Sequence, residues 1–234
     1  MAALTIGFAL SFSPRLAADD IAMISPAPPP DSGDERILGV IPNYQAVSNP
    51  DAPFVPLTVR QKWALVGRSS LDPFNAASAV LGAAMSQREN AHPRYGNGAI
   101  PYTQRFGAAM ADLGMQSMFS AGVLASLLHQ DPRYYRMGPR RNVLVRAGYS
   151  VSRLVVAKQD SGRPAFNASG VFGMGLGIAA SNLYYPGPSR NGTVMAERIG
   201  TSFTAGAMGN LLSEFWPDIR TKVLSRLGPL KRLH

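Results

Sequence analysis

Pairs of small residues four positions apart recur along this chain of 234 residues. Residues four apart share one face of a helix, and small side chains there let a second helix approach closely. The pattern predicts an all-α fold, a bundle of about five to seven helices packed through Gly, Ala and Ser. The same faces would allow copies of the chain to form an oligomer. The pairs are Ala79 with Ala83, Gly107 with Ala111, Gly173 with Gly177, and Ala205 with Gly209.

Residues that favour helix starts divide the chain after Leu57 into segments. Thr58 is a suitable cap for a helix through Leu65, and Asp72 followed by Pro73 suits the start of a second. We expect Trp216 to end one of the last two helices and Pro217 to start the other. The predicted helices cover residues 58–65, 72–87, 102–130, 140–158, 194–216 and 217–234.

The segment Pro164 to Ser189 contains no charged residue, so it is expected to be buried in protein or in lipid. Its glycines allow two interpretations. Helical spacing places Gly170, Gly173, Gly177 and Ser181 on one side, whereas the alternation of large residues with glycine from Phe172 to Ile178 is typical of a strand. The Ala-rich surroundings favour a helix, and a soluble core and a membrane span both stay open.

The expected helix over residues 140–158 is amphipathic. Leu144, Gly148, Val151 and Val155 would form its apolar stripe, and Arg146, Tyr149 and Arg153 would lie roughly opposite. The default interpretation of that second face is a solvated basic surface. The alternative is that Arg146 and Arg153 bind an anionic partner.

The N-terminus has the outline of an export signal. An apolar stretch from Ala2 to Phe12 precedes Pro14 and the small residues Ala17 and Ala18, although no basic residue comes first. We therefore expect a signal peptide at residues 1–18, and an exported protein that is periplasmic or membrane-associated, with the outer membrane open. Residues 19–56 are acidic and proline-rich, which predicts an irregular arm. Its inner part, Arg36 to Tyr44, is apolar enough to dock on a helical domain at residues 57–234.

The charge pattern limits the partners. The net charge is +9, yet residues 1–56 hold six acids and only two arginines, so the rest of the chain carries the positive excess, mostly as arginine. Arginine suits phosphate and carboxylate groups, which predicts anionic lipid or an envelope polymer as partner, although a GC-rich genome would also enrich arginine. The export signal argues against nucleic acid. The absence of cysteine excludes disulfides and thiol catalysis.

The stretch "LLHQDPRYYR", residues 127–136, gathers the chemistry-bearing side chains. His129 and Asp131 are candidates for an acid/base pair, with Arg133 and Arg136 holding an anion. However, residues two apart do not face each other on a helix, and a histidine at a helix end followed by an Asp-Pro turn explains the same residues structurally. Asp112 is either a functional acid or, as we prefer, the partner of an arginine across the bundle.

No metal or cofactor is expected. The three histidines, His92, His129 and His234, lack the spacing of a metal site, and "GMGLG" lacks the context of a nucleotide-binding loop. The chain after Asp218 carries only basic charges, beside a thin apolar line at Ile219, Val223 and Leu227. This tail is a candidate for binding an anionic membrane surface, and a solvated helix is the alternative. Its basic residues are Arg220, Lys222, Arg226, Lys231 and Arg232.

Five blocks carry a resemblance: "RILGVIPNY", "SLLHQDPRYYR", "DSGRPAFN", "SNLYYP" and "EFWPDI". Together they resemble a group of uncharacterised bacterial exported proteins with these blocks in this order, and the similarity covers approximately Arg36 to Arg220. The resemblance implies export but no activity, cofactor or catalytic residue. Our hypothesis is a cell-envelope protein of structural or interaction type, more plausibly not an enzyme. The alternative is a hydrolase acting on an anionic, phosphate-bearing substrate.

Overall fold

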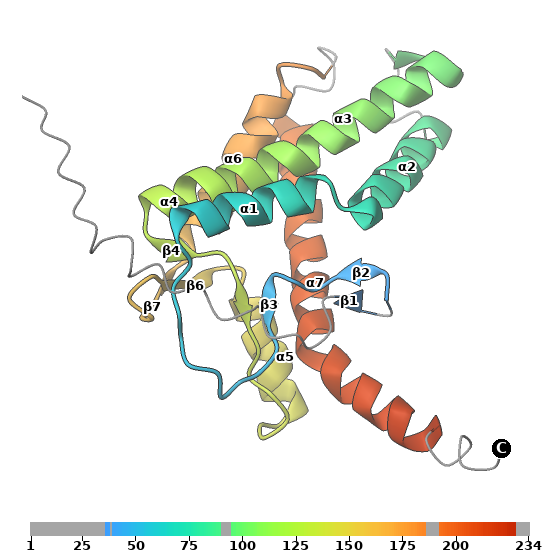
Figure 1. The fold of residues 1–234 in the computed structure, drawn as a ribbon. Coiled ribbons are helices and arrows are strands. Elements are labelled where there is room, and N and C mark those ends of the chain that lie inside the picture. Colours follow the sequence, from blue (N-terminus) through green and yellow to red (C-terminus); the bar gives the residue numbers. More distant parts are fainter. Residues whose placement is uncertain (1–35, 38, 90–94, 186–191, 228–234) are drawn as a thin grey trace, which may run out of the picture. The chain divides into compact units, whose positions relative to one another are not determined.

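The computed structural model describes residues 36–37, 39–89, 95–185 and 192–227 (Figure 1). They belong to one compact unit, Asp31–His234. Helices dominate it and the strands are short, which confirms the predicted helical bundle. The expected signal peptide, the acidic part of the arm, His92 and His234 lie outside the described residues.

The first two helices begin where their capping residues predict. Helix α1, Val59–Ser70, is capped by Thr58, whose hydroxyl accepts from the Gln61 N–H at 3.3 Å while the Gln61 side chain accepts from the Thr58 N–H at 2.8 Å. Helix α2, Pro73–Arg88, starts after Asp72, which accepts from the Phe74 N–H at 2.8 Å. Both caps satisfy backbone donors that have no partner inside a helix.

The third predicted helix ends earlier than expected. It consists of α3, Ala99–Ser117, a π-helical segment η3, Met118–Leu124, and a last turn α4, Ala125–Leu127. His129 then adopts a φ of 51°, in the left-handed region that a non-glycine residue seldom occupies. This conformation ends the helix and directs the chain into a strand.

Helix α6, Ala168–Ser181, resolves the ambiguity of the uncharged segment in favour of a helix for those residues. It packs against α3 and η3 through its glycines. A Cβ at Gly173 would lie 2.6 Å from the backbone nitrogen of Ser120, and one at Gly177 would lie 2.8 Å from the Cα of Gln116. Contact between the two backbones therefore needs glycine at both positions.

The other small-residue pairs differ in whether they are packed against another part of the chain. Ala79 and Ala83 of α2 are buried as predicted. Gly107 and Gly209, in contrast, face open space where a Cβ would meet nothing within 4 Å. Close packing through small residues is therefore confirmed for α2 and α6, and it is not found at these two glycines.

Helix α7, Gly192–Leu227, is continuous through Pro217, so the predicted break at Trp216 is wrong. Figure 1 shows α7 changing direction in its C-terminal part, as a proline inside a helix causes. The helix continues because side chains on both sides of the proline are held by arginines from elsewhere in the fold. Those contacts belong to the site below.

Three small sheets join the helices. Strand β1, Arg36–Ile37, pairs with β2, Ile41–Pro42, and β3, Ala46–Val47, runs parallel to β5, Tyr134–Tyr135. An antiparallel sheet has the order β4–β6–β7, formed by Gln130–Asp131, Val156–Gln159 and Pro164–Phe166. Residues 140–158 are therefore not one helix: α5 covers only Val143–Ser152. Residues 153–155 form a turn, and residues 156–158 enter β6, where β4 and β7 supply hydrogen-bonding partners that the sequence pattern does not reveal.

The inner part of the arm belongs to the body. Ile37 is only 2% exposed, and the Arg36 guanidinium lies 2.8 Å from the Asp72 carboxylate at the start of α2. Docking of Arg36 to Tyr44 is thus confirmed. Strand β3, on the arm side of residue 57, also hydrogen-bonds with β5 of the body.

Among the described residues, no helix combines the length and the apolar character that crossing a membrane requires.

Candidate functional site

The stretch at residues 127–136 does not bring His129 and Asp131 together. The His129 side chain is 83% exposed, and its Nδ1 lies 3.9 Å from Oδ2 of Asp160. Asp131 is buried in β4 and turned toward other partners. The expected acid/base pair is therefore not formed.

The Asp131 carboxylate is bound by two residues that follow it. It accepts hydrogen bonds from Arg133 Nη2 at 2.6 Å, from the Arg133 N–H at 3.0 Å and from the Tyr135 hydroxyl at 2.9 Å. Burial, followed by the nearby Asp131 charge, raises the pKa of Tyr135 well above its usual value. Arg133 also donates to the carbonyl of Val55 at 2.6 Å. This cluster ties the end of the arm to the sheet.

A second buried carboxylate, Glu214 of α7, organises the centre of the site. It is fully buried. Its Oε1 accepts from Arg146 Nε at 2.7 Å and from the Gly138 N–H at 3.0 Å. Its Oε2 accepts from the Tyr134 hydroxyl at 2.8 Å and from the Met137 N–H at 2.9 Å. Four donors from two other segments thus converge on one side chain.

Asp218, one turn further along α7, completes this network. Arg136 Nη2 lies 2.5 Å from its Oδ1, and Arg146 Nη2 lies 2.6 Å from its Oδ2. Burial alone would raise the pKa of Asp218, but the hydrogen bonds from the two arginines outweigh it and hold the pKa below the usual value. Three of the four predicted anion-binding arginines, Arg133, Arg136 and Arg146, therefore already bind carboxylates of the chain.

Helix α5 is oriented opposite to the prediction. Arg146, assigned to a solvated face, has a side chain only 4% exposed, and Ser150 is fully buried. The buried pairs with Glu214 and Asp218 decide the orientation, since an unpaired charge there would be costly. The apolar stripe consequently points outward. Its members Leu144, Val151 and Val155 are exposed, with Leu144 at 81%, and Val143 and Val145 beside them are exposed as well.

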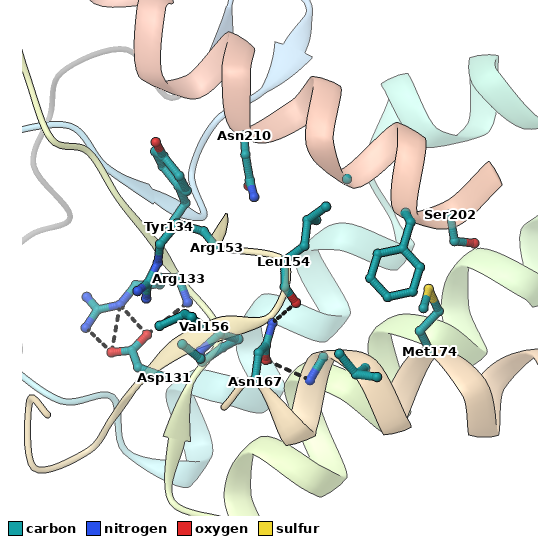
Figure 2. A pocket seen from close by; sticks show the side chains of 16 residues that line it. Asp131, Arg133, Tyr134, Arg153, Leu154, Val156, Asn167, Met174, Ser202 and Asn210 are labelled. Carbon is teal, nitrogen blue, oxygen red and sulfur yellow. Dashed lines mark hydrogen bonds and ion pairs between the residues drawn. The ribbon is translucent and has the colours of Figure 1, made fainter. Parts of the chain in front are cut away.

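A cavity of about 200 Å³ opens beside Tyr134, between the β4–β6 sheet, α6 and α7 (Figure 2). A second cavity of about 300 Å³, lined largely by residues 41–46 and α7, shares Pro132, Tyr134, Gly206 and Asn210 with the first. Tyr134 therefore lines both cavities, and its hydroxyl is held by hydrogen bonds to Glu214 and, at 3.0 Å, to Ser150.

Arg153 is the fourth predicted anion-binding arginine, and it lines the first cavity. Its guanidinium lies over the Tyr149 ring, 5.6 Å from the centroid. In the part of the chain that the structure describes, no carboxylate forms an ion pair with it. Burial, and then the charge of Arg153, lowers the pKa of nearby Lys158. Positive charge is thus in excess around this cavity.

Asp112 pairs with tyrosines rather than with an arginine, which corrects that prediction. It accepts from the Tyr184 hydroxyl at 2.5 Å and the Tyr185 hydroxyl at 2.7 Å. Arg198 lies instead over the Tyr185 ring, 3.7 Å from the centroid.

Sequence reasoning missed a buried lysine. The Lys62 side chain on α1 is 1% exposed, and its Nζ lies 2.7 Å from Asp160 and 3.1 Å from the carbonyl of Ala125. A single lysine in a helix gives no sign of burial, because its partner is 98 residues away.

The basic end of α7 is described in part. Ile219, Arg220 and Lys222 have exposed side chains. The side chains of Arg226, Lys231 and Arg232 lie outside the described residues.

Within the described residues, no three histidine or acidic side chains gather as a metal site would require. No family model matches the chain, and neither a curated protein nor a solved structure is found to be similar to it.

Proposed function

We propose that this chain is an exported cell-envelope protein of interaction type, which attaches to an anionic membrane surface through one end of the α5–α7 pair. We call this end the apolar–cationic tip. It consists of Arg140, Arg141, Val143, Leu144 and Val145 at the start of α5, and Ile219, Arg220 and Lys222 on α7. All eight side chains are exposed.

The two parts of the tip lie at the same end because α5 and α7 run antiparallel. Asn210 donates to the carbonyl of Ser150 at 3.1 Å, Arg146 contacts Glu214, and Arg146 also reaches Asp218. Residue numbers thus fall along α5 as they rise along α7. The start of α5 and the part of α7 after Asp218 therefore lie toward the same end of the pair, where α7 changes direction (Figure 1).

One observation carries the proposal: α5 buries its arginine and presents its apolar residues to solvent. Leaving Leu144 exposed forgoes the roughly 1.5–3 kcal/mol that burial of such a side chain provides. At the boundary between lipid headgroups and acyl chains that free energy is recovered. Each neighbouring cation contributes about 1 kcal/mol near an anionic surface.

Arg140 of the tip is suited to exchange its partner. Arg140 pairs with Asp51 at 3.0 Å, but the two side chains are 81% and 62% exposed. Such a pair adds little stability, so a lipid phosphate can replace the carboxylate at small cost. Export itself is supported by the apolar N-terminus and by the resemblance described above.

The hydrolase alternative has less support. His129 and Asp131 do not meet, and Arg133 and Arg136 hold carboxylates of the chain. A phosphate-bearing substrate would have to displace both carboxylates from buried sites, which would leave buried charges unpaired.

Vesicle sedimentation tests the tip. Leu144→Asp should weaken binding to vesicles containing phosphatidylglycerol by about tenfold or more, because an apolar contact is lost and a repelling charge is added. Leu183→Asp is the matched control. Leu183 is 82% exposed, follows the end of α6 and is not part of the tip. Binding should weaken further with salt and be negligible on phosphatidylcholine alone. Equal binding of the two variants would refute the tip.

Fractionation of the native host tests whether the protein is exported and membrane-associated. A membrane-bound fraction that high salt releases agrees with attachment by cations and a shallow apolar tip. Recovery of the chain with cytoplasmic markers alone would contradict export.

A further inference from the structure

We propose that the cavity beside Tyr134 binds a small amphipathic anion, with its charged group at Arg153 and its apolar part between α6 and α7. This site is separate from the apolar–cationic tip. Its ligand class is a carboxylate or phosphate attached to an apolar group of about the size of a benzene ring or slightly larger.

The lining of the cavity is divided by polarity. Figure 2 shows Asp131 and Arg133 at one side and Met174 at the other, with Leu154 between them. Val171 of α6 and further apolar residues of α7 complete the wall near Met174. A ligand that satisfies both parts must itself have a charged end and an apolar end.

The charged residues of the lining determine whether the charged end of the ligand is an anion or a cation. Asp131 is engaged by Arg133, from which it accepts bonds as short as 2.6 Å, so these two neutralise each other. Among the described residues, Arg153 forms no ion pair with a carboxylate, and its guanidinium lies over the face of Tyr149. Lys158 is not part of the lining, because its ammonium lies over the Tyr135 ring, 3.9 Å from the centroid. The positive group of the lining without a carboxylate partner among the described residues is therefore Arg153, which favours an anion.

The polar groups nearest the apolar part are already satisfied. Asn167 caps α6 by accepting from the Gly170 N–H at 2.9 Å, and it donates to the carbonyl of Leu154 at 3.0 Å. Asn210 donates to the carbonyl of Ser150. The Asn167 amide is thus engaged through both its oxygen and its nitrogen, and the Asn210 amide through its nitrogen. The charged group that would fix ligand orientation is the guanidinium of Arg153.

The volume limits the apolar group. A cavity of about 200 Å³ is somewhat larger than the roughly 150 Å³ apolar cavity that holds benzene. A chain of about six to eight carbons therefore fits, whereas a complete two-chain lipid does not.

Titration calorimetry with octanoate, octyl phosphate and 1-octanol tests the proposal on the full chain. We expect saturable binding of at least one anion and binding of octanol at least tenfold weaker, because a hydrogen bond to a charged group is lost. Preference between the two anions identifies carboxylate or phosphate as the charged group. Absence of saturable binding of both anions by the folded protein, or equal binding of octanol, would overturn the proposal.

Variants locate the ligand. Arg153→Gln should lower affinity for the anion by tenfold or more, and Val171→Phe should lower it by filling the apolar part. Arg60→Gln, on an exposed residue of α1, is the matched control and should bind as the wild type does. Unchanged affinity in a folded Arg153→Gln variant would overturn the assignment. If that variant fails to fold, the comparison of octanoate with octanol on the wild type still decides, and Leu144→Asp should leave this binding unchanged.

Discussion

Replacement of Glu214 by glutamine tests the buried network with almost no change of shape. The carboxylate accepts four hydrogen bonds, two on each oxygen. An amide nitrogen in place of either oxygen would face two donors, so two bonds are lost and Arg146 loses an ionic partner. Removal of one member of a buried ion pair costs about 3–5 kcal/mol. Asp218 still binds Arg146, so we expect the lower end, about 3 kcal/mol.

Urea unfolding followed by circular dichroism measures this loss. A decrease of about 3 kcal/mol corresponds to a melting temperature lower by roughly 6–12 °C for a chain of this length. The matched control is Glu197→Gln, an exposed glutamate on the same helix. Surface substitutions of that kind usually change the free energy of unfolding by no more than about 0.5 kcal/mol.

The control fixes the result that would refute this reasoning. If Glu214→Gln changes the free energy of unfolding by as little as Glu197→Gln does, the four bonds do not hold α5 and residues 134–138 to α7. The outward orientation of the apolar residues of α5 would then lose its explanation, and the proposed tip would lose its basis.

Two further predictions concern packing and pH. Gly173→Ala should destabilise by about 1–3 kcal/mol, because its Cβ would overlap the backbone of Ser120, whereas Gly175→Ala on the same helix meets nothing and should stabilise by about 0.5–1 kcal/mol; thermal unfolding separates the two. Burial would raise the pKa of Asp72, but hydrogen bonds, chiefly from Arg36, hold it below the usual value. Its contribution is therefore present above the unfolded pKa of about 3.9 and is lost as pH falls through the folded value. The stability difference between wild type and Asp72→Asn should accordingly shrink between pH 6 and pH 3, and a constant difference would contradict the ion pair.

Local signals predicted the elements that depend on neighbouring residues. The starts of α1 and α2 follow from Thr58 and Asp72, because a cap bonds to backbone groups two or three residues away. The small-residue face of α6 was also predictable, since Gly173 and Gly177 leave space only for another backbone.

The predictions that failed depend on contacts between distant residues. A pattern of apolar and basic residues on α5 shows two faces, but it does not say which one is buried. The basic face is buried because Arg146 forms an ion pair with Glu214, which lies 68 residues away in the sequence. The same holds for Pro217, which the sequence marks as a boundary although α7 continues through it.

For the candidate site as well, some features were predictable from the sequence and others only from the tertiary structure. The sequence identified residues 127–136 and four arginines as the place to search, because charged and aromatic side chains concentrate there. Only the tertiary structure showed that Arg133, Arg136 and Arg146 bind carboxylates of the chain and that Arg153 lines a cavity. Helix starts, the small-residue faces of α2 and α6 and the excess of arginine were determined by the sequence because each depends on residue type and short spacing. The partner of each charge was decided by the fold, because ion pairs form between residues that only folding brings together.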